Sequence, residues 1–288
     1  MNPVKTALIT DLDNTLFDWV EVWHRCFSSM LEEIVRISGI PAETLYPEIS
    51  AVHQKHGTSE YSFLIEEIPS LYKVLDGRPA TRVFEPAIRA YGEQRRKHLK
   101  LYNGVAETLL KIKGSGAQII GYTESMAFYS NYRIRRLGLD GVLDVVFCPK
   151  DHILPKGIED QRKYPAKHYE LDHTVQRHTP QGSKKPDVDV LESIIEELDL
   201  TKERTVYIGD NLMKDIAMAQ DCGVEDVWAA YGEAHERESY ELLKKVTHWT
   251  TEDVIRESEI KSKGDIQATH AIANFSDLLK LFKFDDKY

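Results

Sequence analysis

Four short stretches of the chain carry side chains suited to acid–base, metal and phosphate chemistry. They are Asp11-Leu12-Asp13, Thr123-Glu124, Lys185-Pro186, and Asp210-Asn211 with Asp215. Carboxylates that gather at one place raise one another's pKa unless a cation lies among them. Mg²⁺ suits such a group, because it binds through one or two carboxylates together with substrate phosphate and water. Lysine and threonine donate to phosphate oxygens, and a carboxylate can attack phosphorus to give an aspartyl phosphate.

The elements around these stretches predict that they meet. Apolar runs of strand length occupy residues 6–10, 116–122, 142–147 and 204–209, as is typical of strands buried on both faces of a parallel sheet. Helical patterns at 107–113 and 187–198 lie between them. This alternation predicts an α/β fold with a doubly wound, Rossmann-like parallel sheet. Ligands bind at the carboxyl ends of the strands in such sheets, where the four stretches are expected to converge.

Residues 19–100 depart from this alternation and show helical patterns alone. An apolar stripe from Val20 to Ile34 marks the first helix, and its Trp and Phe residues are expected in a core. The block is long enough for a small all-helical domain inserted after the first strand. The predicted organisation is a catalytic core of residues 1–18 and 101–288, with a helical cap at 19–100. A helix at 238–245, a strand at 269–273 and a serine-capped helix at 276–282 are expected to complete the core.

The core is predicted to contain an irregular insert at about 149–183, longer than ordinary structureless loops. Alternating residues from Tyr169 to Val175 favour a hairpin within it. The insert also contains His152, His168, His173 and His178. Histidine clusters can bind zinc or nickel, but this spacing fits neither a helix pair nor one strand face. A polar lid or an oligomer arm is the favoured interpretation.

Taken in order, the four stretches resemble the four motifs of the haloacid dehalogenase-like (HAD) hydrolase superfamily. The resemblance covers about residues 4–18 and 101–231. It is nearest to the phosphatase branch whose helical cap follows the first motif, such as phosphoglycolate phosphatases. The resemblance implies a Rossmann-like core with an inserted helical cap.

The resemblance also implies roles for the carboxylates. Asp11 would be the nucleophile, and Asp13 the general acid and base. Mg²⁺ would be held by Asp11, the backbone carbonyl of Asp13, Asp210, and Asp215 directly or through water. Dehalogenating relatives generally lack an acid two residues after the nucleophile, because a halide leaves without a proton. Asp13 therefore favours phosphate esters.

Thr123, Glu124 and Lys185 form the implied phosphate-binding set, in which Thr123 and Lys185 neutralise the charge of the transferring group. The chain departs from the family pattern at Glu124, where relatives often have Asn. An extra carboxylate here disfavours strongly anionic substrates unless it points away or binds a substrate hydroxyl. A second departure is the missing second proline after Lys185-Pro186, and Lys184 lies beside it. Lys185, which directly precedes the proline, is the better match.

The expected function is therefore a Mg²⁺-dependent phosphatase that hydrolyses a small phosphorylated metabolite through an aspartyl phosphate on Asp11. A sugar-phosphate phosphomutase would share every core residue and stays an alternative, and a non-catalytic regulatory protein is a further one. Phosphoglycolate, sugar phosphates and nucleoside monophosphates are all substrates of relatives with similar cores. The sequence selects none of them and indicates no oligomeric state.

Composition narrows the partners and the compartment. The 288 residues contain 37 Lys and Arg against 47 Asp and Glu, a formal net charge of −10. An acidic surface repels nucleic acid, so basic runs such as Arg133, Arg135 and Arg136 are expected on solvated helix faces. No secretory signal and no apolar run of about 18 residues is evident, so no membrane association is expected. The widely spaced Cys26, Cys148 and Cys222 suit a reduced compartment, and the cytoplasm is the expected location.

Overall fold

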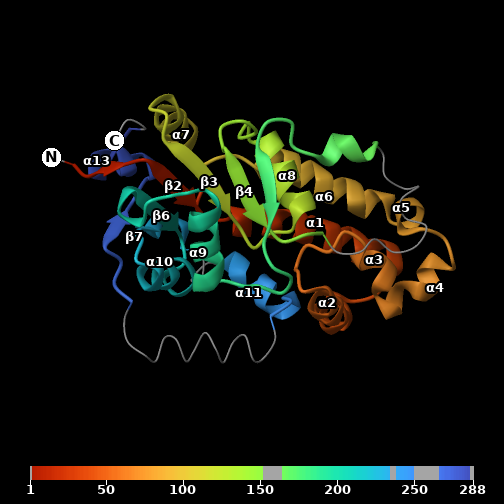
Figure 1. The fold of residues 1–288 in the computed structure, drawn as a ribbon. Helices are drawn as coiled ribbons and strands as arrows, with labels where there is room; N and C mark the ends of the chain where they lie inside the picture. Colours follow the sequence, from red (N-terminus) through yellow and green to blue (C-terminus); the bar gives the residue numbers. More distant parts are fainter. Residues whose placement is uncertain (1, 152–163, 234–237, 250–265, 286–288) are drawn as a thin grey trace. The chain divides into compact units, whose positions relative to one another are not determined.

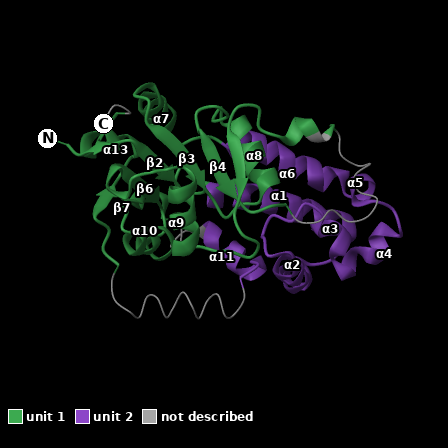
Figure 2. Cartoon of the chain, in the orientation of Figure 1, with its two compact units in different colours: residues 1–18, 100–233, 264–288 green, residues 19–99, 234–263 purple. Residues whose placement is uncertain are grey.

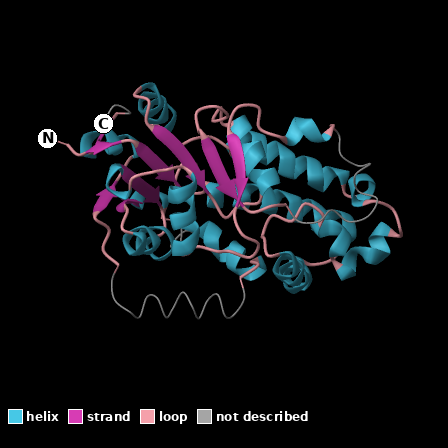
Figure 3. Ribbon diagram, viewed as in Figure 1, coloured by secondary structure: helices cyan, strands magenta, loops and turns pink. Residues whose placement is uncertain are grey.

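The chain forms two compact units. The structure, a computed structural model, describes residues 2–151, 164–233, 238–249 and 266–285. Unit 1 comprises Met1–Asp18, Lys100–Glu233 and Gly264–Tyr288, and unit 2 comprises Trp19–Leu99 and Ala234–Lys263 (Figure 2). Within the described residues, the strands belong to unit 1 and unit 2 is helical (Figure 3).

Unit 1 is built on a seven-stranded parallel sheet with the strand order β5-β4-β3-β2-β6-β7-β8 (Figure 1). At its centre Leu8 of β2 lies opposite Ile119 of β3 and Val206 of β6. A separate two-stranded pair joins β1 and β9. The predicted parallel α/β fold is confirmed. The strands are β1 (Val4–Lys5), β2 (Ala7–Thr10), β3 (Gln118–Tyr122), β4 (Val145–Cys148), β5 (Val175–His178), β6 (Thr205–Gly209), β7 (Glu225–Ala229), β8 (His270–Ile272) and β9 (Lys283–Phe284).

Helices cover both faces of this sheet. From β2 the sheet extends through β3 and β4 on one side and through β6 and β7 on the other. Because crossovers between parallel strands are right-handed, α7 and α8 lie on one face of the sheet and α9 and α10 on the opposite face. Apolar side chains of α9 and α10 pack against β2, β3 and β6. This double coverage explains the continuous apolar runs of the strands. The helices are α7 (Val105–Gly114), α8 (Ala127–Arg136), α9 (Val188–Glu197), α10 (Ala217–Cys222) and α13 (Leu278–Leu281).

The cap of the carboxyl-terminal helix differs slightly from the expectation. A short 3₁₀ turn at Phe275–Asp277 precedes α13, and Asn274 forms a capping box with Asp277. The serine proposed as the cap, Ser276, lies inside that turn instead. Asparagine is as good a cap as serine, because its side-chain oxygen also accepts from the backbone N–H three residues on.

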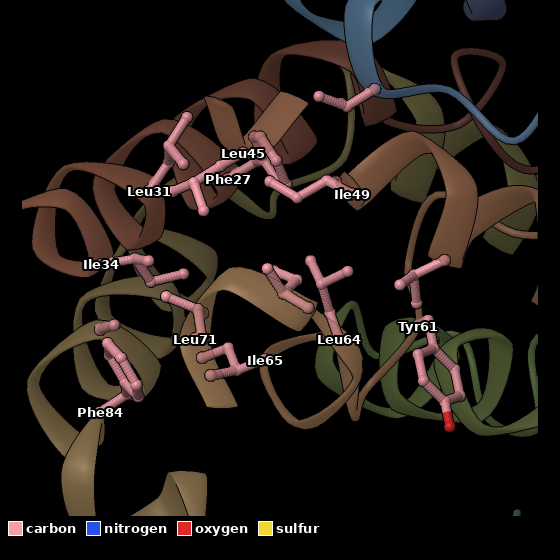
Figure 4. Close-up of a cluster of buried hydrophobic side chains, with 14 of the residues drawn as sticks. Phe27, Leu31, Ile34, Leu45, Ile49, Tyr61, Leu64, Ile65, Leu71 and Phe84 are labelled. Carbon is pink, nitrogen blue, oxygen red and sulfur yellow. The ribbon is translucent and has the colours of Figure 1, made fainter. Parts of the chain in front are cut away.

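Unit 2 encloses a hydrophobic core of its own. Side chains of α1, including Phe27, Leu31 and Ile34, pack with Leu45 and Ile49 of α2 and with the short helices that follow (Figure 4). The rings of Trp23 and Phe27 stack at 4.8 Å, and both side chains are buried, which confirms the predicted core role of these aromatic residues. The helices are α1 (Trp19–Ser38), α2 (Ala42–His56), α3 (Leu64–Glu67), α4 (Tyr72–Leu75), α5 (Ala80–Val83), α6 (Glu85–His98) and α11 (Glu238–Val246).

Helix α11 corrects the expected boundary, which assigned all residues after 100 to the core. It belongs to unit 2, where Tyr240, Leu243 and Val246 are buried in the same cluster as α1 and α2. His53 Nδ1 of α2 also lies 2.6 Å from the carbonyl oxygen of Val246. The apolar stripe of α11 was readable from the sequence, but the surface that covers it was not. The assignment of unit 2 as the cap of the catalytic core stays a prediction.

Within the described part of the insert, the hairpin predicted from residues 169–175 is wrong. β5 runs parallel to β4, with Val175 opposite Val145, and forms the edge of the main sheet. The carboxylate of Asp140 accepts hydrogen bonds of 2.8–3.0 Å from the backbone N–H groups of residues 172–174. These hydrogen bonds hold residues 172–174 beside the residues that precede β4. There Thr174 Oγ1 donates to the carbonyl of Leu143 at 2.9 Å. Alternation alone could not separate a hairpin from a single edge strand.

The three cysteines are free and buried. Among the described residues, no helix has both the length and the apolar character needed to cross a membrane.

Candidate active site

Asp11 lies directly beyond the end of β2, where its N–H donates to the carbonyl of Ile208 on β6 at 2.9 Å. The residue is only 7% exposed. Its Oδ1 accepts a 2.7 Å hydrogen bond from Lys185 Nζ, and its Oδ2 accepts a 3.1 Å bond from Thr15 Oγ1. Burial raises the pKa of Asp11 to about 7, although the Lys185 ammonium acts in the opposite direction. The carboxylate at the centre of the site is thus buried, oriented and paired with a cation.

The ammonium of Lys185 joins two carboxylates. Besides Asp11, it donates to Asp215 Oδ1 at 2.9 Å and to the carbonyl of Tyr122 at 3.0 Å. Burial alone would lower the pKa of Lys185, but Asp11 and Asp215 hold it well above the usual value. Lys184 is exposed. The structure therefore brings Lys185, and not its neighbour, into the site.

Three carboxylates form a potential metal site. One oxygen from each of Asp11, Asp210 and Asp215 lies within 4.8 Å of the others. Asp215 is fixed by Tyr207, whose hydroxyl donates to Oδ1 at 2.8 Å, and by the N–H of Asn211, which donates to Oδ2 at 3.1 Å. Burial, together with the charges of Asp11 and Asp215, raises the pKa of Asp210 well above its usual value. A hard divalent cation with oxygen ligands would relieve this repulsion.

Two glycines allow the backbone to approach these carboxylates. A Cβ placed on Gly209, the last residue of β6, would lie 2.3 Å from Cγ of Asp215. A Cβ on Gly232 would lie 2.1 Å from the carbonyl oxygen of Asn14 and 2.8 Å from Cβ of Asp210. Such distances exclude any side chain, so both positions require glycine for steric reasons.

Asp13 lies in a second group of polar side chains. Its Oδ2 accepts from Ser125 Oγ at 2.6 Å and from Thr123 Oγ1 at 3.3 Å. Its Oδ1 accepts from Arg133 Nη1 at 3.2 Å. The side chain of Asp13 is 21% exposed, so it is partly open to solvent. The two residues assigned to acid–base and phosphate chemistry, Asp13 and Thr123, are therefore in direct contact.

Glu124 points toward protein donors. Its Oε1 accepts from the backbone N–H of Lys185 at 3.1 Å, and its Oε2 pairs with Lys214 Nζ at 2.7 Å. Burial acts to raise the pKa of Glu124, but the Lys214 ammonium outweighs it, so the pKa lies below the usual value. The carboxylate that the sequence introduces beside Thr123 is thus neutralised by a lysine from the turn after β6.

With all of their carboxylates ionised, these residues carry a formal excess of two negative charges. Five carboxylates stand against three cations, 5 − 3 = 2. The carboxylates are Asp11, Asp13, Glu124, Asp210 and Asp215, and the cations are Arg133, Lys185 and Lys214. One divalent cation would balance this excess, and its preferred ligands are the oxygens present.

The family comparison agrees with this arrangement. A family model described as haloacid dehalogenase-like hydrolase matches residues 5–223, which include all of these side chains. The chain belongs to the haloacid dehalogenase-like hydrolase family. The resemblance read from the four motifs is confirmed.

Individual relatives of this hydrolase are distant. It is 22% identical over 231 residues to a glyceraldehyde 3-phosphate phosphatase from Pyrococcus furiosus, an alignment that covers 78% of this chain and 81% of the relative. It is also 22% identical over 239 residues to a glyceraldehyde 3-phosphate phosphatase from Methanocaldococcus jannaschii, covering 82% of this chain and 89% of the relative.

Solved structures share the fold of the hydrolase. A 2-haloacid dehalogenase from Pseudomonas syringae superposes with a TM-score of 0.54 at 20% identity and 98% coverage of both chains. A HAD-hydrolase from Bacillus subtilis, solved with bound magnesium, superposes with a TM-score of 0.52 at 14% identity, covering 97% of this chain and 98% of that one.

Sequence reasoning missed several residues of the hydrolase's site. Arg133 was expected on a solvated helix face, but it is only 5% exposed. It shares the inward face of α8 with Tyr129 and Ser130, which lie one turn earlier, and this spacing was a readable signal. Lys214 stands between Asp210 and Asp215, the two expected metal ligands of its motif, and could also have been considered. The residues missed are Thr15, Ser125, Arg133, Tyr207 and Lys214.

The histidines of the insert form no metal group in the described part of the hydrolase. Among the described residues, Asp11, Asp210 and Asp215 form the one group of three or more His, Cys, Asp or Glu side chains that could share an ion. His168, His173 and His178 are described and are not part of it, whereas His152 lies outside the described residues. The proposed lid or oligomer arm stays a prediction.

Proposed function

We propose that this HAD-like hydrolase is a Mg²⁺-dependent phosphatase of a small phosphomonoester, with Asp11 as the nucleophile. The observation that carries the proposal is the position of Lys185 Nζ, 2.7 Å from Asp11 and 2.9 Å from Asp215, within the group that Asp210 completes. An ammonium and several carboxylates around one buried carboxylate suit a dianionic phosphate held beside a divalent cation.

Asp11, Asp210 and Asp215 would hold the ion with their carboxylates, and Asp13 with its backbone carbonyl. Their all-oxygen donor set fits Mg²⁺ rather than a softer metal. When bound, the ion neutralises phosphate charge and restrains the phosphoryl oxygens.

The chain's own residues then divide the chemistry into two displacements. A carboxylate oxygen of Asp11 attacks phosphorus while the bond from phosphorus to the ester oxygen breaks, and Asp13 gives that oxygen a proton. Asp13 next takes a proton from a water molecule, which attacks the phosphorus of the aspartyl phosphate and releases phosphate and Asp11. Lys185 and Thr123 donate to the phosphoryl oxygens as negative charge shifts among them.

We propose a small sugar-like or three-carbon phosphate as the substrate. The relatives named as glyceraldehyde 3-phosphate phosphatases support the three-carbon class. In the test, phosphate release is measured from glyceraldehyde 3-phosphate, phosphoglycolate, hexose phosphates and nucleoside monophosphates, with Mg²⁺ or with chelator. Release that requires Mg²⁺ and is lost in Asp11→Asn supports the proposal. Formation of an isomeric sugar phosphate without phosphate release contradicts it and indicates a mutase.

A further inference from the structure

The general acid of the proposed reaction is held by a network of side chains that no motif contains. Ser125 Oγ donates to Asp13 Oδ2 at 2.6 Å and accepts from Arg133 Nη1 at 2.8 Å. The same Nη1 donates to Asp13 Oδ1 at 3.2 Å. Arg133, Ser125 and Asp13 thus close a triangle of hydrogen bonds in which Oδ1 of the carboxylate accepts from Arg133 and Oδ2 accepts from Ser125.

Arg133 is built into unit 1 as a rigid part of this triangle. Its side chain is 6% exposed, and its guanidinium lies over the rings of Phe17 and Tyr129, 5.7 and 5.8 Å from their centroids. A buried guanidinium that packs over two aromatic rings has few orientations open to it. Because Arg133 belongs to α8, its hydrogen bond to Oδ1 fixes the Asp13 carboxylate relative to that helix.

Ser125 is fixed from both sides as well. Its N–H donates to Thr123 Oγ1 at 3.0 Å, and its carbonyl accepts from Ser130 Oγ at 2.7 Å. The turn between β3 and α8 thereby links Thr123, which is assigned to phosphate binding, to the residues that orient Asp13. One turn sets both the phosphoryl donor and the acid.

We infer that Arg133, together with Ser125, is a positioning residue that orients Asp13 for proton transfer to the leaving-group oxygen. The inference rests on the proposed phosphatase function. Arg133 acts through Asp13 and transfers no proton itself. Proton transfer requires the acid within hydrogen-bond reach of the oxygen, and a misplacement of about 1 Å can cost about 10²-fold in rate.

The chemistry provides a readout that a purely structural role would not move. The alkoxide released from an alkyl phosphate is a poor leaving group and needs the proton of Asp13, whereas p-nitrophenyl phosphate releases a stable phenolate that does not need it. Because kcat/KM covers the steps up to release of the leaving group, the ratio of kcat/KM for an alkyl and an aryl ester isolates the role of the acid.

The experiment measures this ratio in the full chain with Mg²⁺ for the wild type, Arg133→Ala, Arg133→Lys, Ser125→Ala and the control Arg136→Ala, which changes an exposed arginine of the same helix. We expect Arg133→Ala to lower the alkyl ester's kcat/KM by about 10²-fold and the aryl ester's by only severalfold. Arg133→Lys should recover part of the ratio, Ser125→Ala should lower it less, and Arg136→Ala should not change it.

Equal losses on both esters, or no loss on either, would overturn the inference. The variant Asp13→Asn distinguishes action through Asp13 from a purely structural effect. If Arg133 acts through Asp13, adding Arg133→Lys to Asp13→Asn should not change the ratio of alkyl to aryl ester any further. Ser125→Ala and Arg133→Lys keep the test valid if Arg133→Ala does not fold. A wild type that hydrolyses neither ester would instead refute the phosphatase function, so the two failures are distinguishable.

Discussion

Lys185 Nζ donates a 2.7 Å hydrogen bond to Asp11 Oδ1, and their side chains are only 2% and 10% exposed. The two residues are far apart in sequence and meet because β2 ends between β3 and β6, in the centre of the sheet. A buried carboxylate without a nearby cation favours its neutral form, which cannot act as a nucleophile. The Lys185 ammonium therefore acts against the effect of burial on the pKa of Asp11 and favours the ionised form that the proposed nucleophile needs.

Substitution of Lys185 should lower the rate of the reaction strongly. In Lys185→Met the ammonium is lost, so the pKa of Asp11, already about 7, rises further and a phosphoryl donor disappears. We expect kcat/KM to fall by about 10²-fold or more. The control is Lys184→Met, which changes the exposed neighbour. Equal activity of the two variants would contradict the assignment of Lys185.

Removal of the metal should affect stability as well as rate. Mg²⁺ at a hundredfold excess over its Kd should stabilise the folded chain by about 2.7 kcal/mol. The added stability raises Tm when Mg²⁺ is present. Asp210→Asn and Asp215→Asn remove proposed ligands, so they should abolish this increase in Tm. Differential scanning calorimetry with Mg²⁺ and with chelator measures the effect. An unchanged Mg²⁺-dependent increase in both variants would place the ion elsewhere.

Gly209 offers a steric test of the site. The Cβ of Gly209→Ala would lie 2.3 Å from Cγ of Asp215, so the carboxylate must move. We expect a loss of about 1–3 kcal/mol in the free energy of unfolding, together with loss of Mg²⁺-dependent stabilisation. Gly114→Ala is the matched control, because a Cβ there meets nothing within 4 Å. It should be neutral or slightly stabilising, since alanine is favoured in a helix. Urea titration compares the two.

Glu124 and Lys214 should behave as a pair. Lys214→Met leaves the Glu124 carboxylate uncompensated beside Thr123, so it should raise the KM for a phosphate ester about tenfold, equivalent to about 1.4 kcal/mol. Glu124→Gln in the same chain removes the repulsion and should restore most of the affinity. Steady-state kinetics of the single and double variants give the coupling. Additive effects would show that the two side chains do not cooperate in substrate binding.

His53 should make the stability of unit 2 depend on pH. Burial lowers the pKa of His53 from 6.5 to about 4 in the folded state. Between these values the unfolded chain binds the proton more readily, so stability is full above pH 6.5 and falls as the pH drops toward 4. The loss is up to about 3 kcal/mol, from 1.36 kcal/mol per pKa unit. His53→Asn cannot titrate, so in urea titrations its stability difference from the wild type should shrink as the pH falls.

The sequence was sufficient to predict the elements that position the site. Asp11, Asp210 and the Thr123 stretch each follow an apolar run, and the rule that parallel strands present ligands at their carboxyl ends brings them together. The choice of Lys185 over Lys184 needed the family resemblance, because both lysines lie in the same stretch. Glycine at 209 was visible in the sequence, but its close approach to Asp215 was not.

The remaining features depend on long-range packing. Arg133 was assigned to solvent because its neighbours Arg135 and Arg136 form a basic run, and only the fold reveals that it faces Asp13. Helix α11 has an amphipathic pattern that fits either unit, and its burial against α1 and α2 decides the matter. Local patterns specify which face of a helix is buried, but not which distant segment buries it.

The most direct test of the account is to trap the phosphorylated protein. Asp13→Asn should slow hydrolysis of the aspartyl phosphate, because it removes the base that activates water. After rapid mixing with p-nitrophenyl phosphate and Mg²⁺ and an acid quench, mass spectrometry should locate one phosphoryl group on Asp11. Asp11→Asn should carry none. Phosphate release by the wild type without any phosphorylated Asp11 in the trapped variant would contradict the account.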